Sequence, residues 1–136
     1  MSKVAVVYWS GTGNTEAMAM AVVEGAKANG ADVDLFTSAE FNADKAAEYT
    51  GIAFGCPSMG AEVLEETEFQ PMWDDVQGAL EGKKVVLFGS YGWGDGEWMR
   101  TWEEESPCAI IETYICNATP DDEAEEACRN LGAQIA

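Results

Sequence analysis

The sequence predicts an α/β protein built on a doubly wound parallel sheet, with helices on both faces of the strands. Short apolar runs alternate along the chain with longer segments of helical periodicity. Strands of nearly continuous apolar character are typical of a parallel sheet that is covered on both faces. The chain of 136 residues can bury one substantial core and is too short for two. We therefore expect a single domain over residues 1–136.

Five segments are expected as strands, because each is short, apolar and bounded by turn residues. Such runs leave no polar face for solvent, which fits strands in the interior of a covered sheet. The predicted strands are Lys3 to Trp9, Asp32 to Phe36, Gly51 to Gly55, Lys84 to Gly89 and Ala109 to Cys116.

Four helical segments lie between or after these strands. In the first, the buried face is predicted from the spacing of Met18, Ala21, Val22 and Gly25, which recur at i, i+3, i+4 and i+7. Three tryptophans in the later helical segments are expected in the core or at its rim; they are Trp73, Trp98 and Trp102. The predicted helices are Asn14 to Asn29, Pro71 to Leu80, Glu97 to Glu105 and Asp121 to Ile135.

The chain is strongly acidic, with 25 Asp and Glu against 7 Lys and Arg and a formal net charge of −18. This charge argues against nucleic acid or an anionic membrane as a partner. We expect a monomer that meets basic-surfaced partners transiently, although the same charge could serve solubility alone. The acidic residues gather in three clusters, Glu62 to Glu68, Glu103 to Glu105 and Asp121 to Glu126.

Histidine is absent and the four cysteines form no C-x-x-C pair, so neither a zinc site nor an iron-sulfur cluster is expected. The lack of His also removes the usual base of a hydrolytic triad. No apolar run approaches the roughly 20 residues of a membrane span, and the N-terminus has no secretory signal pattern. We expect a cytoplasmic protein with buried thiols, which are Cys56, Cys108, Cys116 and Cys128.

The segment Ser10-Gly11-Thr12-Gly13-Asn14-Thr15 is predicted as a phosphate-binding loop without a cation. It joins the first strand to the first helix, whose N-terminal amides can bind a phosphate dianion. A Walker loop is excluded, because the first Lys after the glycines is Lys27. A dinucleotide fingerprint is disfavoured, because Glu16 stands where its third glycine would fall.

Two further unusual loops leave the carboxyl ends of predicted strands, where ligands bind in such sheets. An aromatic residue in a glycine-rich loop suggests a stacking platform for a flat ligand. The two loops are Gly55-Cys56-Pro57-Ser58-Met59-Gly60-Ala61-Glu62 and Gly89-Ser90-Tyr91-Gly92-Trp93-Gly94-Asp95-Gly96.

The phosphate loop, the segment Met59-Gly60-Ala61-Glu62 and the segment Ser90-Tyr91-Gly92-Trp93-Gly94 together resemble the short-chain flavodoxins of anaerobic bacteria, over the whole chain. The resemblance implies the strand order 2-1-3-4-5 with FMN at the switch point, an arrangement for which flavodoxin is itself a standard example. It also implies a low-potential one-electron carrier that shuttles between semiquinone and hydroquinone and has no substrate turnover of its own.

The same resemblance assigns roles to the three loops. The side chains and amides of residues 10–15 would bind the FMN phosphate. Met59 and Trp93 would cover the two faces of the flavin, and Glu62 would accept the flavin N3 hydrogen. The Gly60 carbonyl would turn toward N5 upon reduction, with a positive φ at Ala61. The remaining expected contacts are Ser58, Ser90, Tyr91, Gly92, Gly94 and Asn117.

Two other classes of protein fit the sequence less well. A small flavin reductase would need a second substrate pocket and a basic site for a nicotinamide dinucleotide phosphate, and the chain has little room for either. A phospho-accepting receiver domain needs paired acids after the first strand and an Asp after the third. Those places hold Trp9-Ser10 and Cys56-Pro57, which argues against a receiver.

Overall fold

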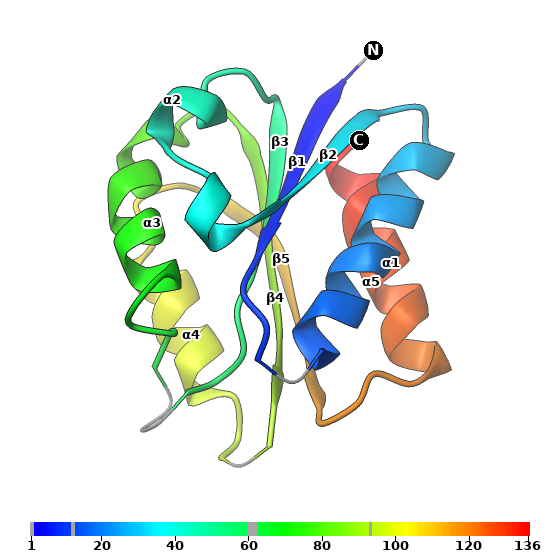
Figure 1. The fold of residues 1–136 in the computed structure, drawn as a ribbon. Helices are drawn as coiled ribbons and strands as arrows, with labels where there is room; N and C mark the ends of the chain where they lie inside the picture. The colour runs from blue at the N-terminus through cyan, green and yellow to red at the C-terminus, as the bar shows by residue number, and fades with distance from the viewer. Residues whose placement is uncertain (1, 12, 60–62, 93) are drawn as a thin grey trace.

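The computed structural model describes residues 2–11, 13–59, 63–92 and 94–136. These residues form a five-stranded sheet with the order β2-β1-β3-β4-β5 (Figure 1). Every neighbouring pair is parallel. The predicted fold class and strand order are therefore confirmed. The strands are β1 (Lys3–Tyr8), β2 (Asp32–Thr37), β3 (Gly51–Gly55), β4 (Lys84–Tyr91) and β5 (Ile110–Asn117).

Helices cover both faces of the sheet, as Figure 1 shows. On one face α1 and α5 lie side by side, and on the other face α2, α3 and α4 form the cover. Short 3-10 helices at Ser38–Glu40 and Gln77–Ala79 complete the described elements. The α-helices are α1 (Asn14–Ala28), α2 (Ala43–Ala46), α3 (Phe69–Val76), α4 (Glu97–Glu105) and α5 (Asp122–Ile135).

The predicted strand and helix boundaries agree with the structure to within two residues, apart from the C-terminal end of α3 and one missed segment. Helix α3 begins at Phe69 rather than Pro71 and tightens into a 3-10 turn at Gln77. The structure adds the Ser38–Glu40 turn and α2, for which no helix was predicted. Both added elements are single turns closed by side-chain caps from Thr37, Glu40 and Asn42, so they lack the periodicity that identifies longer helices.

Each face of the sheet has its own core. Beneath α3 and α4 the core is aromatic, and the rings of Trp73 and Trp102 meet edge to face at 5.5 Å. With Trp98 they are at most 4% exposed, which confirms their predicted place in the core. Beneath α1 and α5 the core is largely aliphatic, and it includes the predicted helix face at Met18 and Val22.

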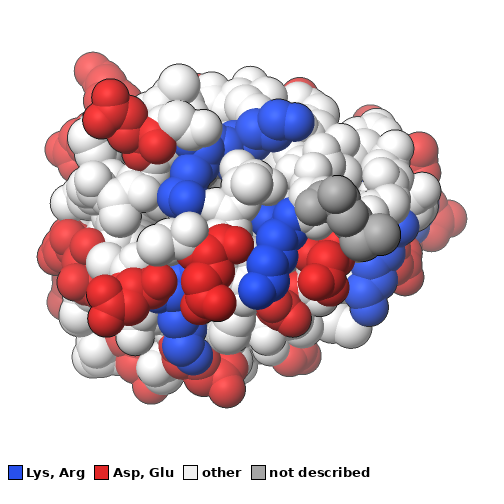
Figure 2. Space-filling view, turned by 90° about the horizontal axis from the view of Figure 1, so that it is seen from above, with Lys and Arg blue, Asp and Glu red and all other residues white. Residues whose placement is uncertain are grey.

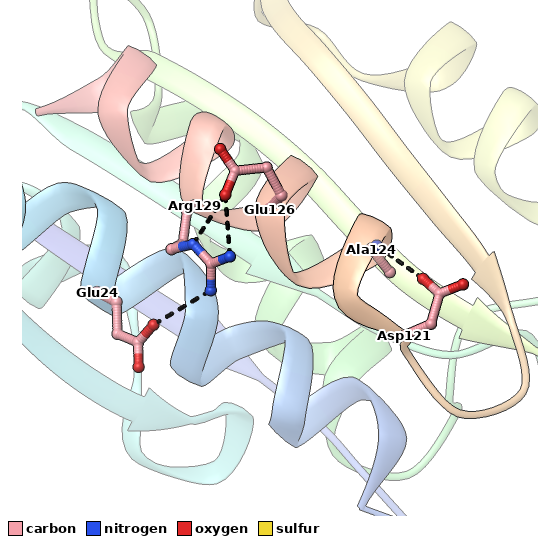
Figure 3. A network of polar contacts seen from close by, with 5 residues as sticks. All are labelled: Glu24, Asp121, Ala124, Glu126 and Arg129. Carbon is pink, nitrogen blue, oxygen red and sulfur yellow. Dashed lines mark hydrogen bonds and ion pairs between the residues drawn. The ribbon is translucent and has the colours of Figure 1, made fainter.

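Helices α1 and α5 pack closely enough for their backbones to touch. A Cβ atom on Gly132 would lie 2.1 Å from the Val22 carbonyl oxygen, so this crossing requires glycine. At its surface Arg129 of α5 bridges the two helices (Figure 3). Its Nη2 lies 2.9 Å from Glu126 Oε2 and its Nη1 lies 3.6 Å from Glu24 Oε1.

Candidate functional site

A cleft of about 420 Å³ lies at the carboxyl ends of β1, β3 and β4. The chain leaves β1 toward β2 on one side and later returns to β3 on the other, so the cleft lies at the switch point of the strand order. None of the described residues that line it carries a charge. They are Trp9, Gly11, Asn14, Pro57, Ser58, Met59, Ser90, Tyr91, Gly92 and Ala118.

The loop between β1 and α1 forms one wall of the cleft. Gly13 precedes the first residue of α1 and has a φ of 93°, a left-handed conformation that favours glycine. Its amide donates a 3.0 Å hydrogen bond to Ser10 Oγ, which closes the loop on itself. The N-terminus of α1 therefore lies at the cleft, where its first-turn amides and helix dipole favour an anion.

Two buried hydroxyl groups beside the cleft have no hydrogen-bond partner among the described residues. They belong to Thr15, in the first turn of α1, and to Ser58, in the loop after β3. Their side chains are 1% and 4% exposed. Buried polar groups in proteins normally have partners, so these two hydroxyls indicate a ligand that supplies hydrogen-bonding groups.

The loop after β3 is held by backbone hydrogen bonds. The Ser58 amide donates to the Ser90 carbonyl at 3.1 Å, and the amides and carbonyls of Met59 and Val63 bond reciprocally at 2.9 Å. This pairing closes a three-residue connection whose members lie outside the described residues. The roles expected for Gly60, Ala61 and Glu62, including the positive φ at Ala61, therefore stay predictions.

The loop after β4 is tied to the end of β5. The Ser90 hydroxyl donates a 2.6 Å hydrogen bond to the Ala118 carbonyl, and the Ala118 amide donates to the Tyr91 carbonyl at 2.7 Å. Ala118 has a φ of 57°, which is uncommon for a residue with a side chain. The Ser90 hydroxyl thus positions Ala118 in the cleft wall, while its oxygen can still accept a bond from a ligand.

The structure brings together most of the described residues that the sequence singled out. Gly11, Asn14, Ser58, Met59, Ser90, Tyr91 and Gly92 line the cleft. Ser10, Gly13 and Thr15 belong to the same loop and helix start without lining it, and Gly94 and Asn117 are exposed beyond it. Thr12 and Trp93 lie outside the described residues.

Three lining residues were missed by the sequence analysis. Trp9 directly precedes the phosphate loop, and this position was the available signal. Pro57 adjoins Ser58 in a loop already singled out. No sequence pattern marks Ala118 as a lining residue, because it reaches the cleft only through its hydrogen bonds with Ser90 and Tyr91.

A further residue that sequence reasoning missed is Glu65, a buried carboxylate near the cleft with an exposed fraction of 5%. Burial opposes its ionisation. Hydrogen bonds from the Thr67 hydroxyl and from the amides of Phe69, Glu68 and Thr67 outweigh burial and hold the pKa of Glu65 below its ordinary value. The sequence does not distinguish Glu65 from the exposed acidic residues beside it, because all of them belong to one acidic cluster.

All four cysteines are free thiols. Cys56 and Cys128 are buried as predicted, and desolvation raises the pKa of both, that of Cys128 to about 12. Cys108 and Cys116 are only half-buried, which corrects the prediction that every thiol is buried. Within the described ranges no three His, Cys, Asp or Glu residues gather as a metal site would require.

The family model described as "Flavodoxin" matches residues 6–132 of this chain. The chain belongs to the flavodoxin family. A flavodoxin from Megasphaera elsdenii is 47% identical over 136 residues, covering 98% of each chain. One from Clostridium beijerinckii is 45% identical over 134 residues, covering 96% of this chain and 97% of that flavodoxin. The solution structure of two-electron reduced Megasphaera elsdenii flavodoxin has a TM-score of 0.88, with 97% of each chain covered.

Flavodoxins are electron-transfer proteins rather than enzymes. They carry electrons on a bound FMN, which cycles between its semiquinone and hydroquinone states. The predicted family, cofactor and one-electron role are thus confirmed at the level of the family. The residues present also fit FMN, because the flavodoxin cleft combines an uncharged lining with unpartnered hydroxyls near a helix N-terminus. Among the described residues, no helix has the length and apolar character that a membrane crossing requires.

Proposed function

We propose that the cleft holds FMN with its phosphate at the β1–α1 loop and its ring between the loops that follow β3 and β4. The observation that carries this proposal is the pair of buried, unpartnered hydroxyls of Thr15 and Ser58. The phosphate ligands in this proposal are the side chains and amides of Ser10, Gly11, Thr12, Gly13, Asn14 and Thr15.

No cation assists this phosphate site in the described part of the cleft. The α1 dipole and neutral donors therefore carry the binding, as in other helix N-terminal anion sites. The Ser10 hydroxyl already orients the Gly13 amide, which keeps the loop folded before the phosphate arrives. Preorganisation of this kind reduces the free-energy cost of ordering upon binding.

The ring-binding part of the cleft is built from side chains that exclude water. Trp9, Met59 and Tyr91 line it, and their apolar surfaces suit a flat aromatic ligand. When bound, FMN supplies a ring that takes up and releases electrons one at a time. The other residues proposed at the ring and ribityl chain are Ser58, Gly60, Ala61, Glu62, Ser90, Gly92, Trp93, Gly94 and Asn117.

The charge distribution supports basic-surfaced proteins as electron donors and acceptors. Figure 2 shows basic side chains among acidic ones at the end of the molecule where the strands begin. Lys3 and Lys84 are the first residues of β1 and β4, and Lys27 lies in the last turn of α1. At the cleft end the basic Arg100 is paired with Asp95 at 3.0 Å. A basic partner is therefore steered toward the cleft end of a monomer.

A reducing compartment, and hence the cytoplasm, is the proposed location, because the four thiols are free.

The decisive experiment titrates flavin-free protein with FMN and with riboflavin and follows the flavin fluorescence. Because riboflavin lacks the phosphate, we expect FMN to bind at least about a hundredfold more tightly, from two or more charge-assisted hydrogen bonds. Inorganic phosphate should compete with FMN and leave riboflavin binding unaffected. Equal affinities for FMN and riboflavin would contradict the proposed phosphate site.

A further inference from the structure

The carboxylate of Glu65 organises the segment between the flavin-side loop and α3. Its Oε1 accepts hydrogen bonds from the amides of Glu68 at 2.7 Å and Phe69 at 2.9 Å. Its Oε2 accepts from the amide of Thr67 at 3.0 Å and from the Thr67 hydroxyl. The side chain therefore caps the start of α3 from outside the helix, where a negative charge also meets the helix dipole favourably.

The backbone of Glu65 fixes the other end of this segment. Its amide donates to Cys56 Sγ at 3.3 Å, and its carbonyl accepts from the Gln70 amide at 2.8 Å. Cys56 is fully buried, and its amide bonds to the Phe88 carbonyl of β4 at 3.1 Å. One residue thus connects the sheet, directly before the cleft residues Pro57 and Ser58, with the first turn of α3.

The segment also reaches the opposite wall of the cleft. The Nε1 atom of Trp9 lies 3.2 Å from Glu68 Oε2, and the Glu68 amide is one of those held by Glu65. The ring of Trp9 occupies space that a side chain at Gly11 would enter, with ring carbons 3.1 and 3.3 Å from its Cβ position. The orientation of Trp9 is therefore tied to the segment that Glu65 organises.

We propose that Glu65 is a positioning residue for flavin binding, which holds two walls of the ring-binding part of the cleft, at Met59 and at Trp9, through the start of α3. The proposal rests on the proposed FMN site. Without the carboxylate, the turn at residues 66–68 opens part of the time and releases Trp9 and the Met59–Val63 pairing. Apparent affinity then falls in proportion to the fraction of molecules with both walls in place.

The test compares Glu65→Gln with Glu66→Gln in the full-length protein. Each substitution removes one negative charge at nearly the same place, but Glu66 is exposed and caps no helix among the described residues. In Glu65→Gln an NH2 group replaces one of two oxygens that both accept hydrogen bonds, so bonds are lost in either orientation of the amide. Three ligands are titrated into each flavin-free variant, namely FMN, riboflavin and inorganic phosphate, and native-state hydrogen exchange follows the amides of Glu68 and Phe69.

Glu65→Gln should weaken FMN and riboflavin binding by up to about tenfold, because the loss of one charge-assisted hydrogen bond shifts the opening of the turn by about that factor and the affinity follows the closed fraction. Phosphate binding should change much less than flavin binding, because the Ser10–Gly13 hydrogen bond that closes the phosphate loop does not involve α3. Faster exchange of the Glu68 and Phe69 amides should accompany the loss. A variant that merely lowered global stability would leave all three affinities unchanged under conditions where the protein is fully folded.

If Glu65→Gln does not fold, Thr67→Val provides the test, because it removes one hydrogen bond to Glu65 at an exposed position without a change of charge. It should show the same selective loss, only smaller. Equal FMN affinities in Glu65→Gln and Glu66→Gln, or an unchanged affinity in Thr67→Val, would overturn the role of Glu65. A different result tests the proposed function itself: it is contradicted if the unmodified protein binds riboflavin as tightly as FMN.

Discussion

Gly25 of α1 lies so close to Arg129 of α5 that a Cβ atom on Gly25 would stand 1.9 Å from the Arg129 carbonyl oxygen. Both partners in this contact are backbone, so neither helix can move aside by a change of rotamer. Alanine normally favours a helix over glycine by about 1 kcal/mol. Here we expect Gly25→Ala to destabilise the protein by about 3 kcal/mol, because the helices must separate.

Denaturant unfolding of the flavin-free protein measures this effect. Gly78→Ala is a matched control, because no atom of the described residues lies within 4 Å of the Gly78 Cβ position and Gly78 does not have a positive φ. It should be neutral or slightly stabilising. A small or favourable change in Gly25→Ala would show that α1 and α5 tolerate a wider separation than their contact suggests.

Thr15→Val should weaken FMN binding without lowering the stability of the flavin-free protein. The Thr15 hydroxyl is buried and without a partner in the described chain, so its removal should leave the flavin-free protein as stable or make it more stable. FMN affinity should fall about thirtyfold, the loss of about 2 kcal/mol expected for a hydrogen bond to a charged group. Riboflavin affinity should not change.

Ser38→Ala is the control for Thr15→Val. The Ser38 hydroxyl is equally buried and has no partner in the part of the chain that the structure describes, but it follows β2 and does not line the cleft. Its removal should affect neither ligand. Fluorescence titration with FMN decides between the two positions, and a similar loss at Ser38 would mean that the effect spreads through the fold.

The sheet could be predicted from the sequence because its strands are apolar on both faces and its long helices have a regular buried stripe. The close crossing of α1 and α5 could be predicted from the sequence only in part. Gly25 was recognised as part of the buried face, yet its contact with Arg129 pairs residues more than a hundred positions apart, and no local pattern reports such a contact.

The candidate site could be predicted where glycine and hydroxyl residues cluster in sequence, as in residues 10–15. It could not be predicted where a residue enters the cleft through tertiary bonds. Ala118 is held there by Ser90 and Tyr91, and Glu65 differs from Glu66 only in its burial and in the amides it binds. Periodicity and composition predict the same exposed, acidic position for Glu65 as for Glu66.

The pH dependence of stability should reveal the Glu65 cap. Because its hydrogen bonds hold the pKa of Glu65 below its ordinary value in the folded protein, the carboxylate stabilises the fold above the pKa it has when unfolded. This contribution is lost as the pH falls through the lower, folded-state pKa. Between pH 6 and pH 3, the difference in unfolding free energy between the unmodified protein and Glu65→Gln should therefore shrink toward acid.

Comparison of variants is needed here because the other acids also titrate, and their protonation relieves the repulsion of a chain with net charge −18. Glu66→Gln provides the baseline. Its difference from the unmodified protein should be small and should not shrink in the same way. A pH-independent difference for Glu65→Gln would mean that Glu65 contributes packing rather than a charged cap.

The rate of electron transfer to a basic redox protein should depend on where negative charge is removed. Glu66 lies near the cleft end, in the turn that leads into α3, whereas Glu81 lies in the turn before β4, at the opposite end of the strands. At low ionic strength Glu66→Gln should slow association about twofold, and Glu81→Gln should have a smaller effect, because one charge contributes only a few tenths of a kcal/mol across about 10 Å of water.

Stopped-flow measurements over a range of salt concentrations test this prediction. Rates should fall for all proteins as salt rises, and the difference between the variants should vanish once the Debye length is shorter than their distance from the partner. Equal slowing by both substitutions at low salt would mean that net charge alone attracts the partner, without steering toward the cleft.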